Sequence, residues 1–441
     1  MINFVDIETI YDSVEERNID YLSHIYMDKN RMQAIIHRMI TTYFELSDIA
    51  EKSVLLKPNW VRHELKDSDY LCLRTNDNLL LCILEEVLTM SPSKVLIADA
   101  PVQGCIWDKM ITESFLKQVR ELSDKYNVPI DIKDFRRTIT DVASNKVSSD
   151  LHPMSDYLLF DLGSESRLEA ITSSDNRFRV TSYDPDRMAE VHHKGMHKYC
   201  IAKDVFDYDV IITIPKLKTH RMAGMTNALK LLVGINGDKD YLPHHRIGSI
   251  NEGGDNYKNK SLLRTLSNVL IDASNRRRGT SLGRILNIIG SKLWHHSHPD
   301  SARMLNAGWY GNDTIWRTVM DINQIALFGD RCGNIHQEQQ RRLFIIMDGI
   351  IGGQGDGPLH PSPSALGVIA CSDNPYMMDV VAGNLYHLNL DRIPLLREAM
   401  KNVEQIDEYS IIVNSEERKL DDVSNYGIDI EMSPGWRDYN K

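Results

Sequence analysis

The sequence predicts an α/β protein in which mixed or mostly parallel sheets are flanked by helices and interrupted by a helical insertion. Two observations predict this class. Short apolar runs of strand length recur at residues 53–57, 94–98, 209–214 and 342–347. Stretches with helical spacing lie among them, at residues 30–44, 78–89 and 108–125. Strands that are apolar throughout are typical of parallel sheets with both faces covered by helices.

Weaker patterns complete the expected alternation. Shorter apolar runs predict further strands at residues 129–132, 156–162, 178–181, 366–370 and 409–413. Helical spacing predicts two more helices at residues 226–233 and 376–386. In open sheets of this kind, ligands bind outside the carboxyl ends of the strands. Polar motifs that directly follow a strand are therefore the first candidates for a site.

We expect four segments. Residues 1–50 form an N-terminal helical segment, residues 51–254 a first α/β lobe, and residues 312–441 a second α/β lobe. Residues 255–311 break the rhythm because they are rich in Asn, Arg, Ser, Gly and His. We predict that they form a helical insertion or cap. Its cationic helix could contact a membrane surface peripherally or an anionic partner, and the alternative is a solvated helical face.

Composition excludes several classes of function. The 441 residues carry a formal charge of -11, which disfavours nucleic acid as a partner. No apolar run is long enough to span a bilayer, and the N-terminus has no basic stretch followed by an apolar run. The six cysteines form no C-x-x-C pair, which argues against a zinc ribbon or a ferredoxin-type cluster. We therefore expect a cytoplasmic protein.

The clearest motif is the run from Pro215 to His220, directly after the apolar run at residues 209–214. Lys216, Lys218 and His220 alternate, so an extended backbone would turn all three to one side. Two ammonium groups and an imidazole on one face suit a phosphate or carboxylate. We predict that Lys216, Lys218 and Thr219 bind substrate and that His220 is a general acid or base. The alternative is a basic loop paired with acidic neighbours.

Ten residues after His220 comes Lys230, about one turn into a helix that would begin near Thr226. Burial can shift the pKa of such a lysine, and we predict a catalytic role for it. The alternative is a lysine on a helix surface. Further along lie Lys239 and the adjacent pair His244 and His245. Adjacent histidines usually point apart, so a joint role is not expected, and we select His245 as a candidate metal ligand.

A third cluster follows the run at residues 342–347, where Asp348 precedes a glycine-rich stretch that ends at Pro358. Glycines let the backbone approach a ligand and turn N–H groups toward it, so we predict that Gly353 and Gly355 bind substrate. Asp348 is a candidate base or metal ligand. The spacing matches neither a P-loop nor a GxGxxG motif, and a plain glycine-rich turn is the alternative.

Two shorter motifs also stand at strand ends. In Lys57-Pro58-Asn59 we predict that Lys57 and Asn59 bind substrate. In Asp99-Ala100-Pro101 we predict that Asp99 is a metal ligand.

Together these motifs resemble the family of the domain of unknown function number three hundred and sixty-two, over about residues 50 to 390. The resemblance rests on Lys57-Pro58-Asn59, Asp99-Ala100-Pro101, the run from Pro215 to His220, the run from Gly224 to Lys230, and Asp348-Gly349 with Gly357-Pro358. Some members carry a ferredoxin-like module with clustered cysteines. This chain lacks such cysteines, so no iron–sulfur cluster is expected. The family label supplies no reaction.

A more distant likeness concerns spacing alone. In the lactate racemase family a histidine stands ten positions before the lysine that tethers a nickel-pincer nucleotide, and a further histidine follows. His220, Lys230 and His245 are similarly spaced here, although Ala228-Leu229 replaces the glycine pair of that family.

Three functions follow from these patterns. The first is an enzyme that acts on a small phosphorylated or carboxylated metabolite by acid–base chemistry or with a divalent metal. The second is a redox or racemase-like protein with a nickel-pincer cofactor on Lys230. The third is a non-catalytic binding or scaffold protein that uses residues 255–311.

Overall fold

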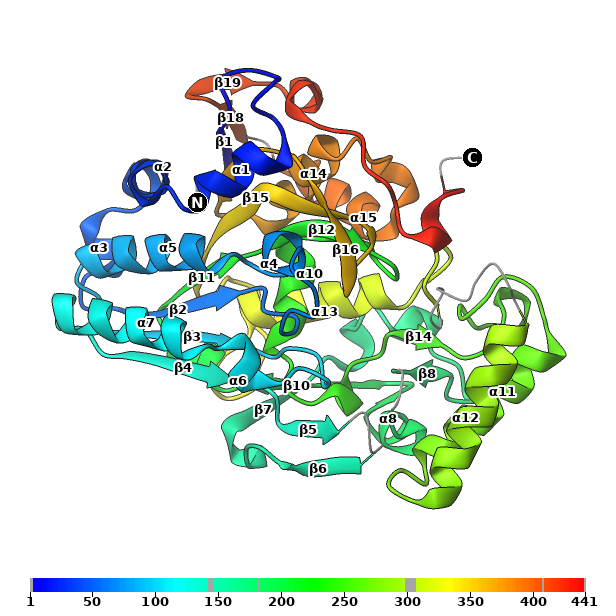
Figure 1. Cartoon of the computed structure of the whole chain (residues 1–441). Coiled ribbons are helices and arrows are strands. Elements are labelled where there is room, and N and C mark those ends of the chain that lie inside the picture. Colours follow the sequence, from blue (N-terminus) through cyan, green and yellow to red (C-terminus); the bar gives the residue numbers. More distant parts are fainter. Residues whose placement is uncertain (1–2, 142–145, 181–182, 298–306, 407, 440–441) are drawn as a thin grey trace.

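The fold is built around one large mixed sheet. This computed structural model describes residues 3–141, 146–180, 183–297, 307–406 and 408–439. The strand order across the sheet is β19-β18-β1-β17-β15-β11-β2-β3-β4 (Figure 1). The bounds are β1 (Phe4–Thr9), β2 (Ser53–Pro58), β3 (Lys94–Asp99), β4 (Ile130–Asp134), β11 (Val210–Ile214), β15 (Arg342–Asp356), β17 (Val368–Ser372), β18 (Ser410–Val413) and β19 (Glu416–Arg418).

One half of the sheet is parallel. β11 pairs in parallel with β2 and β15, β2 pairs with β3, and β3 pairs with β4. In the other half, β17 runs antiparallel to both β15 and β1, while β18 is parallel to β1. The predicted α/β class with a mixed, mostly parallel sheet is confirmed. The parallel half brings several carboxyl strand ends to one edge.

This sheet joins segments that the sequence pattern separates. β1 lies within the expected N-terminal helical segment but forms an inner strand between β17 and β18. Strands from residues 51–254 and from residues 312–441 pair directly, through β11 and β15. The two expected lobes therefore share one sheet, because β15 buries its apolar side chains against β11.

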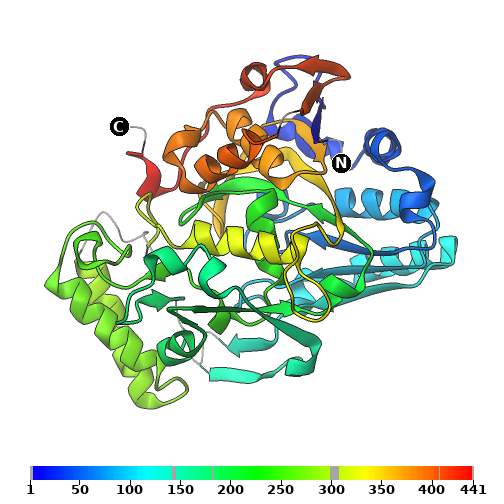
Figure 2. The same ribbon diagram turned by 180° about the vertical axis from the view of Figure 1, so that it is seen from behind.

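Helices cover both faces of the sheet, as Figures 1 and 2 show from opposite sides. Alternate strand residues contribute to two separate apolar clusters, one on each face. One face packs against α2 (Lys29–Tyr43), α5 (Asp77–Thr89) and α7 (Glu113–Tyr126), and the other against α13 (Ile315–Phe328), α14 (Pro375–Leu385) and α15 (Pro394–Val403). The single helix predicted at residues 108–125 is divided into α6 (Trp107–Met110) and α7, because Thr112 caps a new helix by accepting from the Phe115 amide.

Three further strands of the same sheet lie beside the second half of β15. After Pro215 the chain forms β12 (Lys216–His220), which pairs in parallel with β15 and antiparallel with β13 (Gly224–Thr226). β15 runs straight through the glycine-rich cluster and pairs with β16 (His360–Ser364). The glycine-rich loop expected after residue 347 is thus a strand over most of its length. α10 (Ala228–Leu231) follows β13 and carries Lys230.

Smaller elements enclose the carboxyl edge of the parallel strands. They are β5 (Thr138–Asp141) with β6 (Lys146–Asp150), β7 (Tyr157–Asp161) with β9 (His192–His193) and β10 (Met196–Ala202), β8 (Phe178–Arg179) with β14 (His245–Arg246), and α8 (Pro185–Val191). Residues 255–311 contain the predicted helices, α11 (Leu262–Asn275) and α12 (Ser281–His296), which form a hairpin at one side of the molecule (Figures 1 and 2). No helix in the described ranges is long and apolar enough to cross a bilayer.

Candidate functional site

A cavity of about 430 Å³ lies at the carboxyl ends of β2 and β3, between the sheet and the smaller elements. Its wall includes five residues that the sequence pattern singled out: Asn59, Asp99, Lys218, His220 and Lys230. These residues come from segments up to 171 positions apart and meet because their strands end at one edge. Much of the remaining wall is apolar, and its apolar side chains include Val61, Val102, Val180, Met222, Leu231, Val233, Leu242 and Leu359.

Asp99 lines the cavity, but both of its carboxylate oxygens already have partners within the protein. Its Oδ1 lies 2.7 Å from the Nζ atom of Lys57, and its two carboxylate oxygens also accept from the amides of Trp60 and Ala100. Lys57 is fully buried behind it. A Cβ on Gly234 would lie 2.0 Å from the Asp99 carboxylate, so only glycine lets α10's following turn approach the pair. Lys57 and Asp99 thus form an ion pair at the cavity, and their predicted roles in binding substrate and metal stay predictions.

Three lysines surround the cavity without carboxylate partners in the part of the chain that the structure describes: Lys218, Lys230 and Lys239. The Nζ atom of Lys218 donates to the Leu73 carbonyl, and that of Lys239 donates to the Asn236 carbonyl at 3.3 Å. Lys230 makes no hydrogen bond or ion pair with any described residue. The cavity therefore holds an excess of positive charge.

Burial shifts the pKa values of these lysines strongly. It lowers the pKa of Lys218 to about 7, with a further contribution from Lys230. It also lowers the pKa of Lys230 to about 7, assisted by Lys239, and that of Lys239 to about 8. All three lysines line the same cavity. Each of them would be stabilised by an anion in the cavity.

His220 is held in one tautomer. Its Nδ1 accepts from the backbone amides of Met222 and Ala223, both at 3.1 Å. Burial and nearby cations, first among them Lys230, lower its pKa well below the usual value, so the ring is neutral. Because Nδ1 is the acceptor, the single proton of the neutral ring is on Nε2. His220 therefore presents a hydrogen-bond donor at Nε2, and its role as a general acid or base stays a prediction.

Of the adjacent histidines, His244 lines the cavity. Its Nδ1 lies 2.7 Å from the Leu242 carbonyl and donates to it, which leaves Nε2 as an acceptor. Burial lowers its pKa to about 3. His245 belongs instead to β14, and its side chain is buried outside the cavity wall. The structure thus places His244 where the sequence pattern selected His245.

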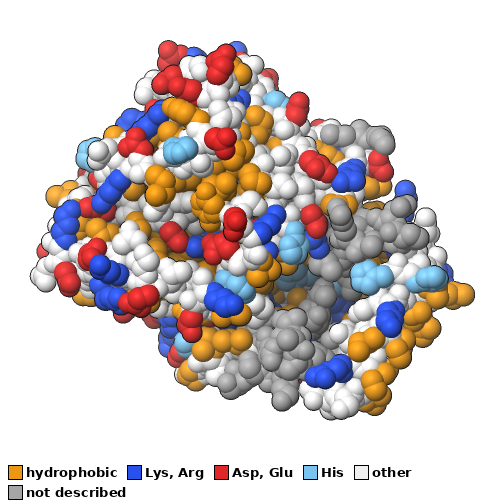
Figure 3. All heavy atoms as spheres, viewed as in Figure 1, with side chains coloured by type: hydrophobic (Ala, Val, Ile, Leu, Met, Phe, Trp, Pro, Cys, Tyr) orange, Lys and Arg blue, Asp and Glu red, His pale blue; other side chains and the backbone are white. Residues whose placement is uncertain are grey.

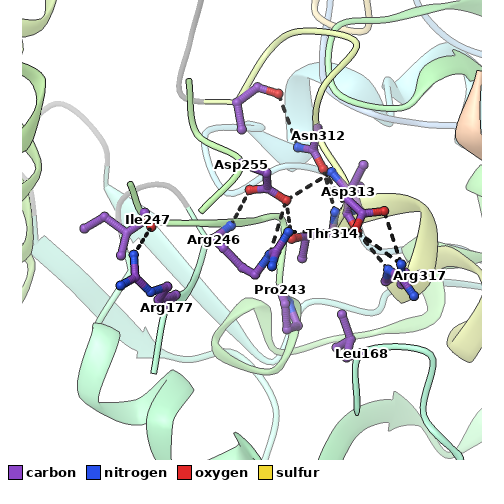
Figure 4. Close-up of polar contacts among 12 residues, drawn as sticks. Leu168, Arg177, Pro243, Arg246, Ile247, Asp255, Asn312, Asp313, Thr314 and Arg317 are labelled. Atoms are coloured by element: carbon purple, nitrogen blue, oxygen red, sulfur yellow. Dashed lines mark hydrogen bonds and ion pairs between the residues drawn. The ribbon is translucent and has the colours of Figure 1, made fainter. Parts of the chain in front are cut away.

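A network behind this histidine fixes its segment to α13 (Figure 4). Asp255 accepts from the Arg246 amide at 2.6 Å and from the Thr314 hydroxyl at 2.5 Å. The side chain of Asn312 donates to the His244 carbonyl at 3.0 Å and accepts from the Thr314 amide at 3.0 Å, directly before α13. The backbone of His244 is therefore held by the beginning of α13.

Asp348 lies away from the cavity in a sealed ion pair. It is 0 % exposed, and its Oδ2 lies 3.0 Å from the Nζ atom of Lys216, which is equally buried. The Tyr26 hydroxyl donates to Asp348 at 2.5 Å and accepts from Lys216 at 2.8 Å. The pairing of β12 with β15 shifts register between Lys216 and Lys218. Lys216 therefore meets Asp348, and neither residue lines the cavity as a base, metal ligand or anion contact.

Thr219, Gly353 and Gly355 contact neighbouring backbone and side chains and do not line the cavity. The Thr219 hydroxyl donates to the Gly355 carbonyl at 2.9 Å. The amide of Gly355 donates to the Glu431 carbonyl at 2.6 Å. A Cβ on Gly353 would lie 2.6 Å from the Lys218 Cβ atom. The glycines allow close packing of β15 under β12, and none of the three residues reaches the cavity.

Three polar atoms in the cavity wall lack hydrogen-bond partners among the described residues. They are the Nδ2 atom of Asn59, the Nε atom of Arg221 and the Oγ1 atom of Thr226, and all three residues are buried. A buried polar group without a hydrogen bond costs about 1–3 kcal/mol. A ligand with acceptor oxygens would satisfy the Asn59 amide.

Lys239, His244, Tyr183 and Asn287 are among the wall residues that were not selected from the sequence. Lys239 and His244 could have been identified from the sequence, because they continue the series of lysines and histidines that recur at intervals of about ten residues or fewer after a strand. Tyr183 and Asn287 follow no strand end. Asn287 comes from α12, so the helical hairpin contributes to the cavity.

Comparison with known proteins agrees with the motif resemblance. Residues 161–384 match the model of the family described as Domain of unknown function (DUF362). A crystal structure of a protein from Thermotoga maritima is similar over 86% of this chain and 59% of that chain, with 8% sequence identity and a TM-score of 0.33. This chain therefore spans less than two thirds of that protein's length. No curated protein matches the chain. The likeness to lactate racemase stays a prediction from spacing.

Proposed function

Because this chain belongs to the DUF362 family, whose name assigns no reaction, we propose its function from the site: the cavity binds a small phosphorylated or carboxylated metabolite and catalyses acid–base chemistry on it. One observation carries the proposal. Three lysines with lowered pKa values surround the cavity and have no carboxylate partner among the described residues.

An anion is the ligand that this arrangement favours. Lys57 and Asp99 neutralise each other, so they leave Lys218, Lys230 and Lys239 uncompensated. Desolvated cations are costly, and a bound phosphate or carboxylate would offset that cost through charge-assisted hydrogen bonds. The surrounding valines and leucines would accept an apolar part of the same molecule. The proposed ligand thus has a charged end and an apolar end.

The same geometry supports a division of chemical roles. A lysine with a pKa of about 7 is partly neutral at neutral pH, so Lys230 can accept a proton from a bound substrate. The Nε2–H group of His220 can donate a hydrogen bond to an oxygen on which negative charge develops. Lys218 and Lys239 would hold the anionic group. His220 remains neutral throughout this scheme.

The arrangement gives less support to metal-assisted chemistry. The described residues contain no group of three His, Cys, Asp or Glu side chains placed to hold a metal. Asp99 is engaged by Lys57, Asp348 is sealed with Lys216, and His245 is outside the cavity wall. A nickel-pincer cofactor on Lys230 remains the alternative enzyme function. The intact mass of the chain from its native host tests it, since a tethered nucleotide adds mass to Lys230.

Titration calorimetry tests anion binding. The chain is titrated with inorganic phosphate and with small phosphorylated and carboxylated metabolites that carry an apolar group. Lys239→Met should weaken binding by about tenfold or more, because a charge-assisted hydrogen bond contributes about 1.5–3 kcal/mol. Lys117→Met is the matched control, since Lys117 is exposed on α7. Equal binding by both variants, or no binding of any anion by the unmodified chain, would overturn the proposal.

The partners and location form part of the proposal. Five of the six cysteines are buried as free thiols, which suits a reducing compartment such as the cytoplasm. A second candidate function is contact with another surface, peripheral membrane contact included. The observation that favours it is the row of exposed apolar side chains on α11 and α12, outside the cavity.

A further inference from the structure

We infer that the outer face of the α11–α12 hairpin docks on a membrane of anionic phospholipid. This inference rests on the surface role proposed above and specifies its partner. It is independent of the reaction in the cavity.

Exposed apolar side chains are concentrated on the hairpin. Of the nineteen large apolar side chains that are exposed in the described ranges, eight belong to these two helices. Those on α11 are Leu262, Leu263, Leu266 and Val269, and those on α12 are Leu282, Ile285, Ile288 and Ile289. Their exposed fractions range from 41% for Leu263 to 81% for Leu262. Single exposed apolar residues need no explanation, but a contiguous patch marks an interaction site.

The apolar rows of both helices face the same way. The helices meet through small residues, where the Ser267 hydroxyl donates to the Gly290 carbonyl and the Ser274 hydroxyl to the Gly283 carbonyl, both at 2.7 Å. The buried residues Arg264, Ser267 and Asn268 mark the inner side of α11. Leu262, Leu266 and Val269 share one stripe at helical spacing, on the side opposite these buried residues.

The same geometry applies to α12. Asn287 lines the cavity and therefore marks the inner side of this helix. Leu282, Ile285 and Ile289 share a stripe on the other side, because they are spaced three and four residues apart. The two stripes form one outer face, and Figure 3 shows apolar side chains along the hairpin with Lys or Arg side chains beside them.

Charge identifies the partner as anionic. Residues 258–297 contain eight Lys or Arg and one acidic residue, Asp272, which gives a formal charge of +7 in a chain of net charge -11. The exposed basic residues of this stretch are Lys258, Lys260, Arg276, Arg277, Arg284 and Lys292. Apolar residues flanked by basic ones are typical of helices that lie in the headgroup region of anionic membranes.

A second copy of the chain fits this face less well. A two-fold interface would place the same patch of both copies together. Two hairpins of formal charge +7 would then face each other, and like charges opposed across an interface are costly. A lipid surface instead offers negative headgroups above an apolar layer, which matches both properties of the hairpin. The two helices, about 21 and 24 Å long, would lie along that surface.

Vesicle sedimentation tests the inference with the full chain. We expect it to sediment with vesicles of phosphatidylcholine and phosphatidylserine, far less with phosphatidylcholine alone, and less at high salt. Ile285→Asn should lower the partition coefficient by at least about tenfold, because a buried isoleucine contributes about 1.5–3 kcal/mol. Lys292→Glu should lower it by about tenfold as well, since each basic residue near the surface contributes about 1 kcal/mol.

Two exposed positions outside the hairpin serve as matched controls. Val14→Asn replaces an exposed apolar side chain as Ile285→Asn does, and Lys117→Glu reverses a charge as Lys292→Glu does. Both control substitutions should leave vesicle binding unchanged. Thermal unfolding checks that every variant folds. Equal binding to neutral vesicles, or hairpin variants that bind like the controls, would overturn the lipid assignment.

Two further measurements distinguish a wrong lipid assignment from a wrong surface role. They are sedimentation velocity, which detects self-association, and cross-linking from position 285, which detects a protein partner. If Ile285→Asn abolishes self-association or a cross-link to a protein while vesicles are not bound, the surface role stands and the lipid assignment is wrong. If the substitution alters none of these associations, both are wrong.

Discussion

At the scale of single residues, Lys218 is expected to favour anion binding while it lowers the stability of the unliganded protein. Its side chain is 0 % exposed, and its ammonium group has only the Leu73 carbonyl as a partner among the described residues. A lysine buried in this way is stabilised in its neutral form, which is why its pKa falls to about 7. A residue that lowers stability without a ligand is well suited to bind one.

Replacing Lys218 should therefore stabilise the unliganded protein. Its pKa is about 7 in the folded chain and near the ordinary lysine value of 10.5 when unfolded, so between these pH values the unfolded chain binds the extra proton. Its penalty is largest below pH 7 and disappears as the pH rises toward 10.5. Lys218→Met should raise the free energy of unfolding by about 2–4 kcal/mol near pH 6.5 and have little effect near pH 10. Urea unfolding across this range measures the difference, and a pH-independent effect would contradict the explanation.

Replacing one residue of the Lys57–Asp99 pair should instead destabilise the protein. Both side chains are buried and 2.7 Å apart, so removal of one partner leaves an uncompensated charge. Lys57→Met should lower the free energy of unfolding by about 3–5 kcal/mol. Lys52→Met, at an exposed position next to β2, is the control. A double-mutant cycle with Asp99→Asn measures the coupling, and additive effects would show that the pair is not coupled.

Residue types after strand ends predicted about half of the site. Asn59, Lys218, His220 and Lys230 line the cavity because carboxyl strand ends meet at one edge. The direction of each side chain could not be predicted. A register shift in β12 turns Lys216 to Asp348, and the choice between His244 and His245 depends on which residue begins β14. The tautomer of His220 depends on amides in a turn that no sequence pattern specifies.

At the scale of elements, the glycines of β15 serve packing between strands. A Cβ at position 353 would lie 2.6 Å from the Cβ of Lys218, 3.0 Å from that of Pro361 and 3.1 Å from the Cys72 carbonyl. Each of these atoms belongs to, or is fixed to, a strand or helix backbone that has little room to move. The glycine-rich stretch thus lets β12 and β16 approach β15 on both sides.

Gly353→Ala should therefore lower the free energy of unfolding by about 1–3 kcal/mol, because overpacking of a buried site forces the strands apart. It should also weaken anion binding by displacing Lys218. The comparison is Gly355→Ala, where no atom lies within 4 Å of the added Cβ and the cost arises only from a φ of +74°. Unfolding and calorimetry of both variants test this, and normal anion binding by Gly353→Ala would disprove the link to Lys218.

The positions of most elements could be predicted because they depend on local patterns. Apolar runs and helical spacing located β2, β3, β11, α2, α5 and α14 to within a few residues. β1 was missed because Asp6 interrupts its short apolar run, and Arg38 on α2 neutralises that buried carboxylate at 2.9 Å. The extension of β15 was missed because its glycines are typical of a loop.

At the scale of the whole molecule, sequence patterns could not show that the expected lobes share one sheet. Local patterns predict a strand but do not specify its neighbours, which depend on pairings between distant segments. β11 and β15 are separated by more than 120 residues and pair directly. The cavity depends on this arrangement, since its wall combines residues from positions 59 to 359.

The position of β1 has a consequence for synthesis of the chain. This strand pairs with β17 and β18, which begin about 360 and 400 residues after it ends. At a translation rate of about 5–20 residues per second, β1 leaves the ribosome roughly 20–70 s before its partners exist. Its apolar residues must stay unpaired throughout that interval. The side of the sheet formed by β17, β1 and β18 is thus completed last, and a ribosome-associated chaperone would have its longest task on this segment.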